Sequence, residues 1–253
     1  MNYASQSLNP IILSLFALIG LASGPISDKT GGNEMQKSTR GYVLPLQPLV
    51  LLDRRSESIP ADWLYPAWNT QIINPDHFPI EGFMDTVLIQ LTGRSECGFT
   101  MPVAGPVTSH FGYRHYHYHK GLDLDLRTGD PVYAAFDGMV RVAHYSSSFG
   151  NVVVIRHWNG LETLYAHLSK LLVQPGDEVE SGQVIGKGGS TGHSTGSHLH
   201  WELHYKGLAF DPQKMVNVES GQLYNDNLLL SPADFKYFIP QSIFNLYSYQ
   251  PAR

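Results

Sequence analysis

Histidine is concentrated in one part of this 253-residue chain. Of the 12 histidines, all but His77 lie between residues 110 and 204. Single histidines are mostly structural, but imidazole is also the commonest metal ligand in proteins. This concentration therefore favours a metal site in the same part of the chain.

The first element with metal-ligand spacing is HKGLD, from His119 to Asp123, in which a histidine and a carboxylate stand four positions apart. In a fully extended strand their Cα atoms would lie about 13 Å apart, too far to share one ion conveniently. A helix would bring them together, but Gly121 and the tyrosine-rich flank disfavour one. We expect Gly121 to form a bend or a bulge that folds the pair onto one metal ion.

Two further elements supply histidines. In His198-Leu199-His200 the two imidazoles share one face of a strand, about 6–7 Å apart, and Leu199 faces the core. One imidazole could bind an ion while the other stands beside its open position. YAHL, residues 165–168, places His167 near a strand end.

Two histidines and one aspartate form an incomplete ligand set for zinc. A tetrahedral ion would keep its fourth position for water, as in catalytic rather than structural sites. Cys97 is the only cysteine and lies outside these elements. Thiolate ligands are therefore not expected, and we interpret Cys97 as an ordinary half-buried residue.

Other side chains compete for these roles. His115 and His117 share a face with His119 if HYHYH is extended, but neither begins the H-x-G-x-D spacing. We rank them behind His119, as residues that are exposed or contact substrate. The remaining candidates are interpreted as surface residues or as neighbours of the ligands: His144, His157, Glu202 and His204.

Several motifs in register over about residues 102–211 resemble the lysostaphin-type zinc metallopeptidases. These are peptidoglycan endopeptidases of glycyl-glycine or D,D specificity, with a small antiparallel-sheet domain. The motifs are SHFGYR (109–114), HKGLD (119–123), GDPVYAA (129–135), GN (150–151), YAHL (165–168), GSTG (189–192) and HLH (198–200).

The resemblance implies one zinc ion per chain, held by His119, Asp123 and His200. It implies that His167 and His198 are catalytic histidines that do not bind the metal. All five positions are filled here, unlike in relatives that have lost ligands and regulate other wall enzymes. Tyr113 and Arg114 match the F-G-x-R element of the family, which is expected to fix the loop or bind substrate.

The expected function is zinc-dependent hydrolysis of the peptide cross-links of bacterial peptidoglycan. The alternative is a non-catalytic wall-binding or regulatory module of the same fold, against which the complete histidine set counts. A second alternative is an exported zinc peptidase that acts on proteins or small peptides.

The elements that must position these residues are short strands. Runs rich in Val, Ile, Tyr and Leu alternate with glycine turns, which predicts a mainly β domain over residues 97–216. We expect a small antiparallel sheet or sandwich with an open groove. The sequences GDPV…DGMV (129–140) and GDEV…SGQV (176–184) are similar, and suggest two hairpin units packed together.

The chain ends are expected to differ from this domain. The apolar run at residues 11–22 has the length of a signal-peptide core, which predicts a leader over residues 1–22 and an exported, periplasmic or extracellular protein. Residues 23–96 are interpreted as a linker followed by an irregular extension or pro-segment, in which His77 could cover the groove as a fourth zinc ligand. The tail, residues 217–253, is expected to hold a short helix that begins near Ser231.

The net charge of the chain limits the classes of partner that we expect. A net charge of -5 and a pI near 6.1 argue against a nucleic-acid binder. The expected partner is peptidoglycan peptide, and we expect a monomer with no transmembrane helix in the mature chain.

Overall fold

The computed structural model describes residues 59–65, 67–74, 86–92, 98–114 and 117–235. The chain divides into two compact units, Met1–Leu51 and Leu52–Arg253, and every described residue belongs to the second. The expected leader, His77, Cys97, His115 and the tail beyond residue 235 lie outside the described residues. Among the described helices, none is long and apolar enough to span a bilayer.

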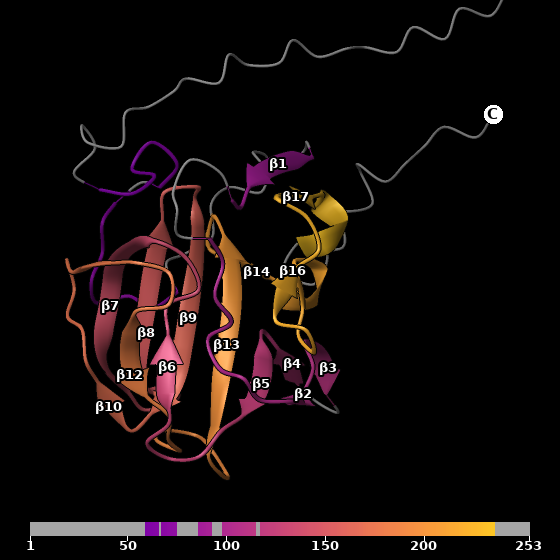
Figure 1. Cartoon of the computed structure of the whole chain (residues 1–253). Helices are drawn as coiled ribbons and strands as arrows, with labels where there is room; N and C mark the ends of the chain where they lie inside the picture. The colour runs from indigo at the N-terminus through magenta and orange to yellow at the C-terminus, as the bar shows by residue number, and fades with distance from the viewer. Residues whose placement is uncertain (1–58, 66, 75–85, 93–97, 115–116, 236–253) are drawn as a thin grey trace, which may run out of the picture. The chain divides into compact units, whose positions relative to one another are not determined.

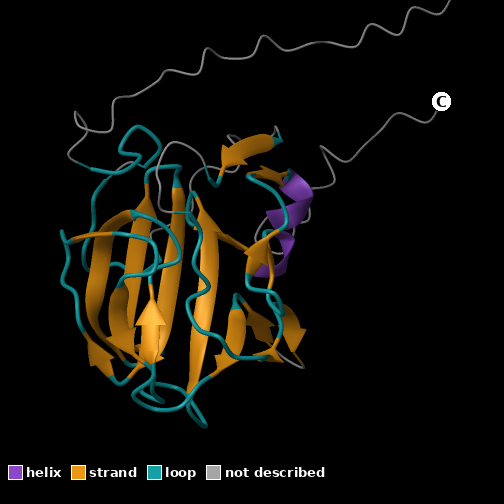
Figure 2. Ribbon diagram, viewed as in Figure 1, coloured by secondary structure: helices purple, strands orange, loops and turns teal. Residues whose placement is uncertain are grey.

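One large sheet carries the long strands (Figures 1 and 2). Its members are β2 (Val107–Ser109), β5 (Leu122–Asp125), β7 (Gly138–Ser146), β8 (Gly150–His157), β9 (Leu161–Leu168), β11 (Glu178–Val179), β13 (His198–Tyr205) and β14 (Leu208–Phe210). They run in the order β11-β7-β8-β9-β13-β5-β2, with β14 also paired to β13. All these pairs are antiparallel, so the expected mainly β, antiparallel class is confirmed.

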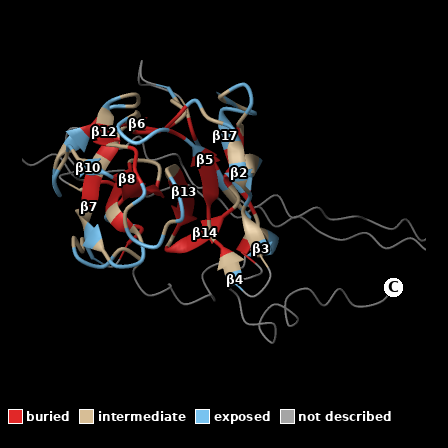
Figure 3. Ribbon diagram, turned by 90° about the horizontal axis from the view of Figure 1, so that it is seen from below, coloured by how far each residue is buried: buried red, intermediate tan, exposed pale blue. Residues whose placement is uncertain are grey.

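The side chains of strand β13 point alternately to the two faces of this sheet. Leu199, Trp201 and Leu203 are fully buried in the main hydrophobic core, on what we call the core face. Figure 3 shows the buried parts of the large sheet in red, as along β5 and β14. Side chains alternate along a strand, so the even-numbered residues 198 to 204 lie on the opposite face, the site face. A smaller apolar cluster lies there too, because its member Ala166 stands directly opposite His200 in the ladder.

A second sheet covers the core face. It consists of β10 (Lys170–Leu171), β12 (Val184–Lys187) and β6 (Pro131–Tyr133), in the order β10-β12-β6. Val132 and Ile185 belong to the same core cluster as Trp201. The core is therefore enclosed between two sheets, as in a sandwich.

The two similar sequence units pack together, but they are not two hairpins. Strand β6 of the first unit pairs with β12 of the second, and β7 pairs with β11. The expectation of a hairpin within each unit is wrong. Each strand finds its partner in the other unit, and the equivalent turn glycines Gly129 and Gly176 both have positive φ, of 97° and 95°.

Short elements complete the fold. In the part of the chain that the structure describes, three two-stranded sheets join β3 (Gly112–Arg114) to β4 (His117–His119), β15 (Val216–Asn217) to β16 (Gln222–Leu223), and β1 (Val87–Gln90) to β17 (Asn227–Leu230). The described residues also form two 3-10 helices, η2 (Pro212–Lys214) and η3 (Pro232–Phe235). The short helix expected near Ser231 is therefore present, as the 3-10 turn η3.

Residues 59–65 and 67–74, here called the strap, belong to the expected N-terminal extension and pack against the large sheet. The fully buried guanidinium of Arg141 donates to the carbonyl oxygens of Asn69, Ile72 and Ile73 at 2.7–2.8 Å. It also pairs with Glu162 at 2.7 Å. The strap thus supplies acceptors for a buried cation.

The same carboxylate holds a second arginine. Arg156 is 1% exposed and pairs with Glu162 at 2.8 Å. Its guanidinium lies 3.9 Å from the ring centroid of Tyr65, in the strap. One carboxylate between two buried guanidinium groups leaves an excess positive charge, which the strap carbonyls and the Tyr65 ring partly compensate.

Arg141→Ala should lower the free energy of unfolding by about 3–5 kcal/mol, because it leaves Glu162 and three strap carbonyls short of a donor. Urea unfolding measures this change. Arg127→Ala, at an exposed arginine, is the control and should shift it by no more than about 0.5 kcal/mol. Equal effects would contradict this account of the strap.

Acid should remove the contribution of Glu162. Burial raises the pKa of this carboxyl, but Arg141 and Arg156 outweigh it and hold the pKa below its ordinary value. The stabilisation is therefore complete above the unfolded pKa of about 4.3 and is lost as pH falls through the folded pKa. The stability difference between wild type and Glu162→Gln should be constant near pH 7 and shrink below about pH 4. A constant difference down to pH 2.5 would contradict it.

Candidate metal centre

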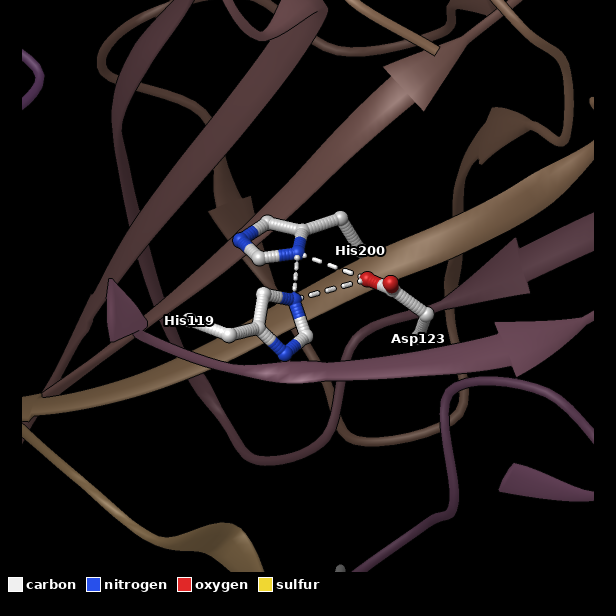
Figure 4. Close-up of side chains that lie close together, drawn as sticks. All are labelled: His119, Asp123 and His200. Carbon is white, nitrogen blue, oxygen red and sulfur yellow. Dashed lines mark hydrogen bonds and ion pairs between the residues drawn. The ribbon is translucent and has the colours of Figure 1, made fainter. Parts of the chain in front are cut away.

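Three predicted ligand residues converge on the site face (Figure 4). His119 Nε2 lies 3.0 Å from Asp123 Oδ1 and 3.0 Å from His200 Nδ1. His200 Nδ1 lies 2.9 Å from the same Oδ1. Three atoms from separate segments therefore form a nearly equilateral triangle.

Strand register brings two of them together. Strands β5 and β13 are antiparallel neighbours in which His200 stands directly opposite Asp123. Directly opposite residues present their side chains on the same face, with Cβ atoms about 4.5–5.5 Å apart. His119 ends β4 and reaches the pair across the bend at Gly121, so the expected bend is confirmed.

Gly121 is required by close packing rather than by an unusual φ. A Cβ at this position would lie 2.3 Å from the carbonyl oxygen of Trp201 and 2.9 Å from Cγ of Glu202. Both belong to β13, beside the ligand His200. The absence of a side chain thus lets the His119–Asp123 bend lie against β13.

The second nitrogen of each ligand imidazole sets where its proton lies. His119 Nδ1 donates to the carbonyl oxygen of His110 at 2.8 Å, and His200 Nε2 donates to Glu202 Oε1 at 2.8 Å. These oxygens can only accept, so each neutral ring keeps its lone pair on the other nitrogen. His119 Nε2 and His200 Nδ1 therefore direct lone pairs toward Asp123 Oδ1.

Three acceptor atoms this close repel one another unless a cation lies between them. For tetrahedral zinc with bonds of about 2.0–2.1 Å, ligand atoms lie about 3.3 Å apart. The observed separations of 2.9–3.0 Å are close to that value, so these residues fit such an ion. Without an ion a proton takes its place: burial lowers the pKa of His200, but Asp123 and Glu202 outweigh it and raise the pKa to about 9.

Arg114 contacts the ligands themselves. Its Nη2 donates to Asp123 Oδ2 at 2.9 Å and lies against His119 Nδ1. Both of these nitrogens are donors, so we assign Asp123 to the guanidinium and the His110 carbonyl to the imidazole. Burial raises the pKa of Asp123, but the two histidines and Arg114 outweigh it and hold the pKa well below its usual range. Of the two roles expected for Arg114, this contact favours fixing the loop.

His167 and His198 lie beside the triangle. Their ring centroids are 4.8 Å apart, and the His167 ring is 5.8 Å from that of His200. His198 Nε2 lies 3.7 Å from Asp123 Oδ1, while its Nδ1 donates to the carbonyl of Gly196 at 2.9 Å. The structure therefore brings all five predicted metal and catalytic residues together.

His167 has two features that its sequence does not reveal. Its φ is 62°, in the left-handed region that costs a non-glycine residue about 1–2 kcal/mol. Its Nδ1 donates to the carbonyl of Thr191 at 2.8 Å, which leaves Nε2 as an acceptor. Burial lowers the pKa of His167 to about 4, so the ring is neutral at pH 7.

The competing residues lie elsewhere. His117 is exposed, and the two ring nitrogens of His144 lie within hydrogen-bonding distance of the carbonyl oxygens of Gln71 and Tyr145. His157 is not on the surface: it is buried at 1% exposure, where it contacts Thr163 Oγ1 and the Asp137 carbonyl. Tyr113 is 74% exposed on the β3–β4 hairpin next to His119.

Of two contacts of the ligands, one was missed at the sequence level, and the other, that of Glu202, was left open between a surface residue and a neighbour of the ligands. The His110 carbonyl holds His119, and Glu202 holds His200. For Glu202 a signal existed, because residues two apart on a strand share a face. For His110 the contact is made by backbone, which residue type does not indicate.

Gly121→Ala should lower the free energy of unfolding by about 1–3 kcal/mol, since the new methyl group overlaps the backbone of β13. Gly98→Ala is the matched control, because a Cβ there meets no atom within 4 Å. Thermal or urea unfolding of both variants measures the difference. A Gly121→Ala protein as stable as Gly98→Ala would show that β13 can move away freely.

Known proteins share this part of the chain. Residues 117–212 match the family described as Peptidase family M23. The DD-carboxypeptidase/endopeptidase Mpg of Neisseria meningitidis is 44% identical over 112 residues, which are 42% of this chain and 26% of that protein. The peptidoglycan DD-endopeptidase ShyA of Vibrio cholerae is 45% identical over 96 residues, 38% of this chain and 22% of that protein.

The matches thus span about a quarter of the length of these relatives. Among solved structures, the catalytic domain of lysostaphin from Staphylococcus simulans is 34% identical, with a TM-score of 0.42 over 43% of this chain and 90% of that one. The family assignment rests on the sequence matches. They confirm the resemblance found in the motifs: residues 117–212 of this chain are a domain of peptidase family M23.

Proposed function

We propose that this chain is a zinc-dependent endopeptidase that hydrolyses peptide cross-links of bacterial peptidoglycan. The observation that carries the proposal is the triangle of His119, Asp123 and His200, three converging acceptors with two further imidazoles beside them. This arrangement suits one zinc ion per chain. When bound, zinc supplies an acid that polarises a carbonyl and lowers the pKa of a water molecule.

The chain's own residues supply the proton transfers. His198 takes a proton from the attacking water as general base, since its Nδ1 donates to Gly196 and leaves the lone pair on Nε2, which lies 3.7 Å from Asp123 Oδ1. His167 is neutral with Nε2 as an acceptor, which favours orienting the water over donating to the oxyanion. Arg114 holds Asp123 Oδ2, so that Oδ1 stays directed at the centre.

The substrate class is supported by the relatives. ShyA is named a peptidoglycan DD-endopeptidase, and Mpg a DD-carboxypeptidase/endopeptidase. We therefore propose D,D-type cross-links as the bond that is cut, and a periplasmic or extracellular location. The exposed Tyr113 on the hairpin beside His119 is proposed to contact the peptide.

Zinc content and hydrolysis of purified sacculi test the proposal together. Wild type should hold one zinc ion and release fragments that mass spectrometry assigns to D,D cleavage, and a chelator should stop release. His119→Ala should lose both zinc and activity. His198→Ala should keep zinc and lose about 10²–10⁴-fold in turnover, because only the general base is removed.

His117→Ala is the control, because this exposed histidine lies on the same hairpin as His119. It should keep zinc, which separates the loss of a ligand from a general disturbance of the hairpin. Zinc binding without any hydrolysis would favour a non-catalytic wall-binding module. Release of fragments at an undiminished rate by His198→Ala would overturn the role of that residue.

A further inference from the structure

Glu202 is a buried carboxylate between two histidines of the same strand. Its Oε1 accepts from His200 Nε2 at 2.8 Å, and its Oε2 contacts His204 Nε2 at 2.5 Å. Residues 200, 202 and 204 share the site face of β13 through strand alternation. Glu202 and His204 are 2% and 4% exposed, so both are shielded from water.

The Glu202 side chain is closely surrounded by neighbouring residues. Leu164 stands directly opposite on β9, and a Cβ at Gly121 would lie 2.9 Å from Glu202 Cγ. The glycine of the H-x-G-x-D element therefore leaves room for this carboxylate as well as for the backbone of β13. The carboxylate cannot turn toward solvent to exchange its partners.

The carboxylate determines which nitrogen of His200 is free. With Nε2 donating to Glu202, the lone pair lies on Nδ1, the atom 2.9 Å from Asp123 Oδ1 and 3.0 Å from His119 Nε2. An anionic partner on the far nitrogen also makes an imidazole a stronger electron donor to a metal. His204 occupies the second oxygen and so fixes the plane of the carboxylate.

We infer that Glu202, held by His204, is a positioning residue that directs Nδ1 of His200 at the metal. The inference rests on the proposed zinc site and adds to its ligands a two-residue support on β13. Both side chains are almost fully buried. Their effect on hydrolysis passes through His200 alone.

Zinc affinity, measured by competition with a chromophoric chelator on the full chain, tests this directly. Glu202→Leu should weaken binding by about 10–100-fold. Glu202→Gln should weaken it less, because its amide oxygen still accepts from His200 but carries no charge. His204→Gln should give a smaller loss, since it frees the carboxylate without removing it.

A readout of the His200 tautomer separates positioning from general stability. Nitrogen NMR of the imidazoles should show the proton of zinc-bound His200 on Nε2 in wild type and in Glu202→Gln. His157→Gln is the matched control: it alters another buried histidine, which contacts Thr163 on the core face. It should lower stability and leave zinc affinity unchanged.

The outcomes are distinct. A wild-type chain that binds no zinc refutes the proposed function itself. A wild type that binds zinc while folded Glu202→Gln and Glu202→Leu bind it equally well refutes the role of Glu202 and leaves the proposed function intact. If Glu202→Leu does not fold, Glu202→Gln decides. If His157→Gln lost as much zinc affinity as Glu202→Leu, the effect of Glu202 would be one of general stability and the positioning role would be refuted.

Discussion

The site depends on one pairing, the antiparallel ladder between β5 and β13 that sets His200 opposite Asp123. Together with the bend at Gly121, it forces three acceptor atoms within 3.0 Å of one another. Such a group is stable only with a proton or a metal ion at its centre. The neighbouring residues offset the negative charge of the three acceptors. Arg114 neutralises Asp123, and the acceptors at His110 and Glu202 keep the ring protons outside the triangle.

One face of β13 carries the histidines of the site, and the other face carries the apolar residues that pack in the core. Leu199, Trp201 and Leu203 anchor the strand in the core, so the backbone that carries His198 and His200 is held rigidly. Rigid support matters because ligand geometry tolerates errors of only about 0.5 Å. The backbone of His167 is strained, because its φ lies in the left-handed region, and its ring lies beside the ligands.

The same sheet buries a second polar group away from the ligands. Arg141, Arg156 and Glu162 lie on β7, β8 and β9, and Arg141 is completed by three carbonyls of the strap. Buried charges seldom stabilise a protein by themselves, but removing one partner is costly. The strap therefore belongs structurally to the sheet, although it lies before the matched family segment in the sequence.

Residue types and spacing predicted the strand-rich domain, the bend at Gly121 and the placement of Leu199 in the core, and they singled out the histidine-bearing elements as a metal site. Which of these side chains would be ligands was implied by the family resemblance. The predictions from residue types and spacing follow from short-range rules: side-chain alternation, glycine conformation and ligand preference. Tertiary structure decided that His200 rather than His198 lies nearer Asp123, that repeated units pair crosswise, and that Arg114 and Glu202 hold ligands. The reason is that strand register and buried partners join residues far apart in the chain, which no local pattern specifies.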